Sequence, residues 1–196
     1  MSTVISLIGL PGCGKSTIGK HLGRALAAEF VDSDAAIERQ LGESIRDYFE
    51  REGEPAFRDV EEATIASLLG KPGIVLATGG GAVVRPANRA ALSGASVVVY
   101  LRSTPEELYR RLRHDTHRPL LQVKDPLARL RALYRERDPL YRSTAHYLVE
   151  VGRPSVQTLV NMILMQLELA GVIDASRVPS STEPRPVPAR SDAGPV

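Results

Sequence analysis

The sequence predicts a three-layer α/β fold, in which a central five-stranded parallel sheet is covered by helices on both faces. Two patterns carry this prediction: short apolar runs recur along the chain, and stretches with helical periodicity separate them. The runs are TVISLI (3–8), FVD (30–32), GIVLA (73–77), SVVVYL (96–101) and HYLVEV (146–151). Nearly continuous apolar strands that alternate with helices are typical of a parallel sheet buried on both sides.

The helical stretches between these runs complete the domain. We expect helices over 17–28, 34–52, 55–69, 86–93, 104–114, 126–143 and 154–170. In the last stretch, apolar residues three and four positions apart predict one buried stripe. Its members are Val156, Leu159, Val160, Ile163, Leu164 and Leu167.

The chain after about Asp174 has a different composition. It is rich in Pro, Ser and Ala and has few large apolar residues, so burial cannot offset the entropy lost on ordering it. We therefore expect one domain over residues 1–173 and a disordered tail over 174–196.

Composition excludes several classes of protein. The 196 residues, 43% hydrophobic and 24% charged, suit a single globular domain rather than a multidomain motor, and a net charge of +2 does not favour nucleic-acid binding. No apolar run approaches the roughly 18 residues that a membrane span needs, and no positively charged region precedes the N-terminal apolar run. The single Cys13 fits a reducing compartment. We expect a cytoplasmic protein without nucleic-acid or membrane partners, and a monomer because no strong apolar surface stripe stands out.

The segment GLPGCGKST (9–17) matches the phosphate-binding pattern G-x-x-x-x-G-K-[ST]. A strand precedes it and a helix follows, so backbone N–H groups and the helix N-terminus can point at one anion. By the chemistry of the motif, Lys15 reaches the β- and γ-phosphates, Ser16 faces Mg²⁺ and Thr17 contacts an inner phosphate. The amides expected at the phosphates belong to Gly12, Cys13 and Gly14. The alternative is a glycine-rich turn that only joins strand to helix.

The carboxylate for the metal is expected in FVDSD. The chain has no N-K-x-D for reading a guanine base, and the apolar strand GIVLA leads into Thr78 and three glycines rather than an acid. Asp32 and Asp34 end the second predicted strand, at the edge of a parallel sheet where ligands bind, and alternation would place both on one side. One can hold Mg²⁺ through water while the other accepts a proton from a substrate hydroxyl. The alternative is that one of them, Asp34 above all, caps the following helix.

The phosphate-binding segment and DSD are two of six motifs in this chain. In chain order the six are GLPGCGKSTIGKHLGRAL (9–26), DSD (32–34), GEPAFRDVE (53–61), ATGGGAV (77–83), HRPLL (117–121) and RERDPLYR (135–142). With them, residues 3 to about 170 resemble a shikimate kinase, one of the small P-loop kinases similar to nucleoside monophosphate kinases. The resemblance implies a P-loop kinase fold with a lid, and transfer of the γ-phosphoryl of ATP to the 3-hydroxyl of shikimate.

The resemblance also implies an acceptor pocket. Shikimate carries a carboxylate and three ring hydroxyls, and a guanidinium fork pairs well with a carboxylate. Arg58 and Arg137 match the family's arginines, and Asp34 matches the residue that contacts the ring hydroxyls. Gly79, Gly80 and Gly81 let the backbone approach the substrate, with Gly80 as the favoured contact.

The lid and the adenine contacts follow from the same resemblance. DTHRPLLQVKD (115–125) contains a proline and no sustained helical period, and it matches the lid, with Arg118 entering the site on closure. A cation there would stabilise the transferring phosphoryl group while water is excluded. Arg110 matches an arginine that lies against adenine, and Arg153 falls near the other adenine-contacting region, although VEVGRPS departs from the commoner Asp-Thr pattern.

Two other functions remain open on the sequence alone. A related kinase that acts on gluconate or a nucleoside monophosphate would share the phosphate loop and lid, but DSD, Arg58 and TGGG argue for a different pocket. A nucleotide-dependent binding module could instead dock a partner through the proline-rich tail, which would leave Asp34 and Arg118 without an obvious purpose. The four histidines have no paired ligand spacing, so we expect Mg²⁺ and no zinc site.

Overall fold

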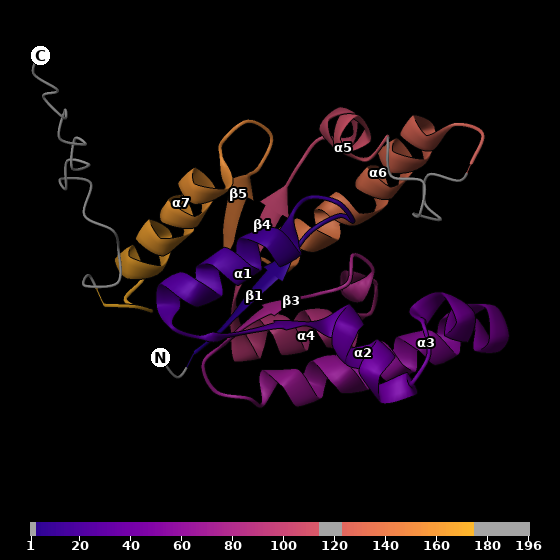
Figure 1. The fold of residues 1–196 in the computed structure, drawn as a ribbon, viewed down its shortest axis with the longest axis horizontal. Helices are drawn as coiled ribbons and strands as arrows, with labels where there is room; N and C mark the ends of the chain where they lie inside the picture. The colour runs from indigo at the N-terminus through magenta and orange to yellow at the C-terminus, as the bar shows by residue number, and fades with distance from the viewer. Residues whose placement is uncertain (1–2, 114–122, 175–196) are drawn as a thin grey trace, which may run out of the picture.

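A five-stranded parallel sheet with helices on both faces forms the domain (Figure 1). The computed structural model describes residues 3–113 and 123–174. Its strands are β1 (Val4–Ile8), β2 (Glu29–Asp32), β3 (Ile74–Ala77), β4 (Ser96–Arg102) and β5 (Tyr147–Glu150). They lie in the order β2-β3-β1-β4-β5, and each neighbouring pair is parallel. The predicted fold is confirmed, and each strand lies within one residue of its predicted bounds.

The helices form two layers around this sheet. They are α1 (Lys15–Leu26), α2 (Ser33–Leu41), α3 (Ile45–Leu69), α4 (Pro86–Ala95), α5 (Pro105–Leu112), α6 (Pro126–Thr144) and α7 (Val156–Leu169). Gly53, with φ 82°, kinks α3 and divides it into two helical segments, at the break predicted between 52 and 55. On one face α1 packs beside α7, and on the other α4 packs beside both α3 and α6 (Figure 1). A short 3₁₀ helix (Ala82–Val84) follows the glycines after β3, which the helical pattern did not predict.

The hydrophobic core lies between the sheet and these layers. The predicted stripe on α7 is confirmed: Leu159, Val160, Ile163, Leu164 and Leu167 are buried, and Val156 packs at its margin. On the other side of the domain, the largest fully buried side chains are Tyr100 and Tyr141, whose rings stack with centroids 4.9 Å apart. This stack joins β4 to α6.

The prediction of one helix over 34–52 is wrong. Helix α2 ends at Leu41, where Gly42 adopts φ 72° and its N–H donates to the Glu38 carbonyl at 2.9 Å. Ser44 then begins α3 by accepting a hydrogen bond from the Asp47 N–H at 3.1 Å. A left-handed glycine followed by a serine cap ends one helix and starts another, although the apolar period runs through both.

The expectation of a monomer rests on the lack of an apolar surface stripe, and that premise is wrong. Helix α7 exposes Met162, Met165 and Leu169, spaced three and four residues apart. Their stripe is hidden in the sequence because the opposite face of α7 is apolar too. Monomeric state therefore stays a prediction without this support.

Within the described ranges, the helices are too short or too polar to cross a bilayer.

Two glycines in open surroundings test whether the left-handed backbone at Gly42 favours glycine over alanine. Gly42 has φ 72°, whereas Gly94 lies near the end of α4 with ordinary helical geometry, and a methyl group at either position would meet no atom within 4 Å. We expect Gly42→Ala to lower the free energy of unfolding by about 1 kcal/mol because alanine is strained in the left-handed region. Gly94→Ala should raise it by up to about 1 kcal/mol through helix propensity. Urea denaturation measures both, and equal effects would contradict the assignment of strain to Gly42.

Candidate active site

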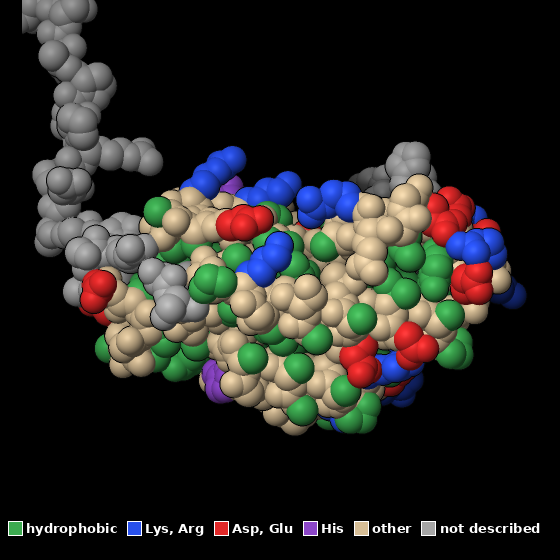
Figure 2. All heavy atoms as spheres, turned by 90° about the horizontal axis from the view of Figure 1, so that it is seen from below, with side chains coloured by type: hydrophobic (Ala, Val, Ile, Leu, Met, Phe, Trp, Pro, Cys, Tyr) green, Lys and Arg blue, Asp and Glu red, His purple; other side chains and the backbone are tan. Residues whose placement is uncertain are grey.

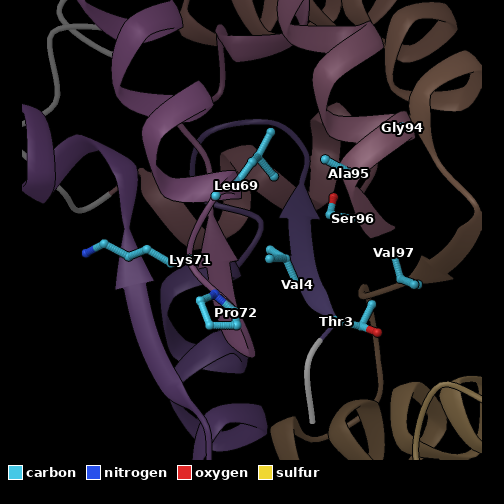
Figure 3. Close-up of a pocket in the computed structure, with 10 residues that line it drawn as sticks. Thr3, Val4, Leu69, Lys71, Pro72, Gly94, Ala95, Ser96 and Val97 are labelled. Atoms are coloured by element: carbon cyan, nitrogen blue, oxygen red, sulfur yellow. The ribbon is translucent and has the colours of Figure 1, made fainter.

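Two hollows of similar volume lie at opposite edges of the sheet, and their chemistry differs. The first, of about 480 Å³, lies where β1 and β4 begin (Figure 3). Its lining carries no carboxylate, and its one charged residue, Lys71, directs its ammonium group away from the hollow (Figure 3). The second, of about 420 Å³, lies at the carboxyl edge and is lined by the phosphate loop together with Asp32 and Asp34. The second hollow is therefore the candidate active site.

The phosphate loop joins β1 to α1 and forms one wall of this hollow. Its lining residues from the loop are Pro11, Gly12, Gly14, Lys15, Ser16 and Thr17. Lys15 is 9% exposed, and its ammonium donates to the carbonyls of Gly9 at 2.8 Å and Leu10 at 3.0 Å. The Lys15 side chain, at the start of α1, therefore folds back onto the backbone of the predicted phosphate loop.

Asp32 connects the phosphate loop to α2. The Ser16 hydroxyl donates to Asp32 Oδ2 at 2.7 Å, while Asp32 Oδ1 accepts from the Asp34 N–H at 3.0 Å. Asp32 rather than Asp34 is thus the helix cap. The expectation that strand alternation places both acids on one side is wrong, because β2 ends at Asp32 and Asp34 lies in the first turn of α2. Both nevertheless line the hollow.

The pair Ser16 and Asp32 fits a Mg²⁺ ion. A hydroxyl and a carboxylate oxygen are hard ligands of the kind that Mg²⁺ takes, together with water and substrate phosphates. Among the residues that the structure describes, no group of three His, Cys, Asp or Glu side chains could hold a metal by itself. An ion here would depend on phosphate oxygens for the rest of its coordination.

Asp34 has an unusual electrostatic environment. Burial, reinforced by the nearby Asp32 carboxylate, raises its pKa to about 6, and Lys15 opposes the shift. A methyl group at Gly79 would lie 2.5 Å from Asp34 Oδ1, so the glycine leaves the space that the carboxylate fills. A carboxylate with a pKa near 6 is ionised at neutral pH and is a stronger base than an ordinary aspartate.

Arg58 stands on α3 beside the loop that follows β3 and contains Gly79, Gly80 and Gly81, which we call the glycine-rich loop. Its Nη1 donates to Glu61 Oε2 at 2.7 Å and its Nη2 to Glu54 Oε1 at 3.0 Å. The Arg58 side chain is 11% exposed and the Glu61 side chain 1% exposed. A side chain at Gly81 would collide with the Arg58 guanidinium, so the loop and the arginine are in close contact.

Gly80 lies between the phosphate loop and α6. A methyl group on Gly80 would lie 2.6 Å from Pro11 Cδ, which places Gly80 directly against the loop. The Gly80 carbonyl accepts hydrogen bonds from Arg137 Nη1 at 3.1 Å and from the Tyr141 hydroxyl at 2.5 Å. Arg137 is thereby brought to the same edge as Arg58.

Glu61 is the residue of this cluster that sequence reasoning missed. It lies inside GEPAFRDVE, but the sequence assigns it no role. Its carboxylate pairs with Arg58, and a methyl group at Gly79 would also lie 3.0 Å from Glu61 Oε1. Burial raises its pKa, while Arg58 and Arg137 oppose that shift. The signal that could have identified it is its spacing of three residues from Arg58, which puts both on one helix face.

The remaining predicted residues lie apart from this cluster. Arg110 is exposed on α5 and Arg153 is exposed in the loop after β5. Arg111, next to Arg110, links these two segments by donating from Nη2 to the carbonyls of Val151 and Gly152. Arg118 and most of the predicted lid lie outside the described residues.

Comparison with known proteins gives one consistent result. A family model described as shikimate kinase matches residues 11–168. A shikimate kinase of Paracidovorax citrulli is 57% identical over 171 residues, covering 86% of this chain and 93% of that protein, and one of Burkholderia thailandensis is 53% identical over 169 residues, covering 86% and 92%. The solved structure of shikimate kinase from Acinetobacter baumannii in complex with shikimate has a TM-score of 0.82 and 43% identity, covering 87% of this chain and 95% of that one.

The raised pKa of Asp34 predicts a pH-dependent change in stability. Because the folded pKa of about 6 exceeds the usual 3.8, the native state binds more protons than the unfolded state between these values, and stability is lost as the pH rises through this window. We expect Asp34→Asn to be more stable than the wild type by on the order of 2 kcal/mol at pH 7.5. The gain should shrink as the pH falls from 6 toward 4. Urea denaturation across this range measures it, and an Asp34→Asn variant no more stable than the wild type at pH 7.5 would contradict the burial of this charge.

Proposed function

This chain belongs to the shikimate kinase family, and on that premise we propose how its residues share the reaction. The activity is ATP-dependent phosphorylation of shikimate. The observation that carries the proposal is the position of Asp34: it lines the hollow of the phosphate loop and faces Gly79, beside the loop that contacts Arg58 and Arg137. Phosphate donor and acceptor would therefore meet at this carboxylate.

Two arginines would hold the acceptor by its carboxylate. Arg58 is anchored by Glu61 and Glu54, which orient its planar fork before substrate arrives. Arg137 keeps unused donor capacity: its buried Nε has no hydrogen-bond partner among the described residues and lies 3.5 Å from Glu136 Oε1. A carboxylate placed between the two guanidinium groups would receive charge-assisted hydrogen bonds.

Asp34 would act on the hydroxyl that receives the phosphoryl group. In the transfer step, the 3-hydroxyl oxygen of shikimate forms a bond to the γ-phosphorus, the bond from that phosphorus to the bridging oxygen of ADP breaks, and the proton passes to the Asp34 carboxylate. Its pKa of about 6 leaves it ionised at neutral pH and able to accept this proton. Gly79, Gly80 and Gly81 would form the backbone wall beside the acceptor.

The phosphate loop would hold the donor. The amides of Gly12, Cys13 and Gly14 would bind the phosphates. Thr17, which lines the same hollow, would contact an inner phosphate. Lys15 would exchange its carbonyl partners for β- and γ-phosphate oxygens. Bound Mg²⁺ supplies charge neutralisation at the phosphates. Ser16 and Asp32 are the residues that would hold it, since their oxygens already lie 2.7 Å apart.

The adenine contacts, the lid and the tail complete the proposal. Arg110 and Arg153 would flank the adenine, supported by the Arg111 bonds that join their segments. Arg118 would enter from the lid over 115–125 to stabilise the transferring phosphoryl group.

We also propose a domain over 1–173 followed by a tail over 174–196, a monomeric state, and a cytoplasmic location. The location is supported by Cys13, which is a free, buried thiol.

Acceptor specificity is tested by shikimate-dependent ADP formation with purified protein, ATP and Mg²⁺. Parallel reactions contain gluconate, AMP or CMP in place of shikimate. We expect rapid ADP release with shikimate alone, because the two arginines and Asp34 fit an acid that carries ring hydroxyls. ADP formation with gluconate or a nucleotide at a comparable rate would contradict the proposed pocket. Tight ATP binding without transfer to any of these acceptors would favour a nucleotide-dependent binding module.

The role of Arg58 is tested by Arg58→Lys, which keeps a cation for buried Glu61 while removing the planar fork. We expect KM for shikimate to rise about 10- to 100-fold, the size of losing one to two charge-assisted hydrogen bonds. KM for ATP should change less than about twofold. Steady-state kinetics at saturating co-substrate measure both constants.

A matched control lies in the first segment of α3, before the kink at Gly53. Arg46→Lys alters the exposed Arg46–Glu50 pair near the start of α3. On the face seen in Figure 2, acidic and basic side chains lie close together at one end of the molecule. Exposed pairs of this kind contribute little free energy, so both KM values should match the wild type. An unchanged KM for shikimate in Arg58→Lys would overturn the assignment of Arg58.

A further inference from the structure

Tyr141 is a buried residue next to the site with no role in the reaction described above. It is 0% exposed, and its ring stacks on Tyr100 of β4 at an interplanar angle of 25°. A phenylalanine would fill nearly the same volume and keep the same stack. The hydroxyl therefore needs an explanation of its own, because burying a polar group is costly unless a partner compensates for it.

The partner of that hydroxyl is the Gly80 carbonyl, at 2.5 Å. The same carbonyl accepts Arg137 Nη1 at 3.1 Å, so two donors from one face of α6 occupy one oxygen. Residues 137 and 141 are four positions apart and so lie above each other on the helix. The Tyr141 hydroxyl thus helps to fix the position of the Gly80 peptide relative to the Arg137 guanidinium.

The other side of Gly80 faces the phosphate loop. Its Cα approaches the Pro11 ring so closely that a methyl group would lie 2.6 Å from Cδ and 3.1 Å from the Pro11 nitrogen. Gly80 is therefore held between Pro11 and α6. A shift of its peptide would move the wall of the acceptor pocket relative to the phosphate loop.

We propose that Tyr141 is a positioning residue for the acceptor: through the Gly80 carbonyl it holds Gly80 and Arg137 in register, and so sets shikimate affinity without touching shikimate. This inference rests on the proposed function, which assigns Gly80 and Arg137 to the acceptor pocket. Burial raises the pKa of Tyr141 above its usual value, so its hydroxyl stays a donor over the pH range in which the enzyme would be assayed.

The test is Tyr141→Phe, with Tyr100→Phe as its matched control. Both variants remove one buried tyrosine hydroxyl and keep the stacked rings, but the Tyr100 hydroxyl donates to Asp138 Oδ1 at 2.8 Å rather than to Gly80. Asp138 keeps Arg102 and Arg142 as further donors. We expect Tyr141→Phe to raise KM for shikimate about 5- to 20-fold, the size of losing one buried hydrogen bond, with KM for ATP changed less than about twofold. Tyr100→Phe should leave both KM values within about twofold of the wild type.

A second arm uses the Arg137→Lys background and isothermal titration with shikimate. If Tyr141 acts through the Gly80–Arg137 arrangement, Tyr141→Phe should weaken shikimate binding much less in that background than in the wild type, whereas a loss of general packing would act equally in both.

Thermal unfolding of each variant verifies that it is folded at the assay temperature. Should Tyr141→Phe prove unfolded, the titration is run instead on Tyr141→His, which keeps a ring with an N–H donor and should retain more affinity than Tyr141→Leu. Equal affinities of these two variants would count against the hydroxyl contact.

Three results would overturn the inference. They are an unchanged KM for shikimate in Tyr141→Phe, a rise of both KM values together, and the same pattern in Tyr100→Phe. A wild type without any shikimate-dependent ADP formation would overturn the proposed function and this inference with it. An active wild type beside an unaffected Tyr141→Phe would overturn the inference alone.

Discussion

The parallel register of β1, β2 and β3 is the constraint on which the site depends. Leu7 of β1 and Asp32 of β2 both pair with Ala77 of β3, so the three strands end at the same level of the sheet. The phosphate loop, the segment with Asp32 and Asp34, and the glycine-rich loop therefore begin side by side. The Thr78 N–H extends this pairing by donating to the Leu7 carbonyl at 3.1 Å. Ligands bind at this edge in open α/β sheets because loops diverge there.

The glycine-rich loop is the common wall of the site. Asp34 fills the space beside Gly79, Pro11 packs against Gly80, and the Arg58 guanidinium packs against Gly81. Each of these contacts needs the absence of a side chain. The loop thus contacts groups from the phosphate loop, α2 and α3 at three consecutive residues. Its backbone is then available to a substrate.

The same convergence has a cost in stability. Asp34 and Glu61 are carboxylates whose burial raises the pKa of each, and of the two it is Glu61 that pairs with a neighbouring arginine. Groups of this kind are favoured at functional sites because a shifted pKa serves the chemistry, and for Asp34 a neutral side chain would stabilise the fold more. The electrostatics of this edge are therefore better explained by phosphoryl transfer than by folding.

Local patterns in the sequence predict the strands, most helices and the phosphate loop, because apolar period and glycine spacing act over short distances. They fail at Gly42, where the left-handed backbone ends a helix whose apolar period continues. They also fail for Glu61, whose pairing with Arg58 on the same helix is distinguished only by its burial, and for Tyr141, whose partner Gly80 lies outside its helix. Arg58 and Arg137 are found through motif resemblance rather than period. Burial and tertiary contacts decide Glu61 and Tyr141, whereas Gly42 is decided by its own backbone conformation.

In the proposed reaction, the arginines hold the carboxylate of the acceptor while Asp34 faces the hydroxyl that is phosphorylated. The most direct measurement is a crystal structure of this protein with shikimate, ADP and Mg²⁺. We expect the shikimate carboxylate between Arg58 and Arg137, and the 3-hydroxyl oxygen within hydrogen-bond distance of an Asp34 carboxylate oxygen. A shikimate bound in the reverse orientation, with its carboxylate directed toward the phosphate loop, would contradict it.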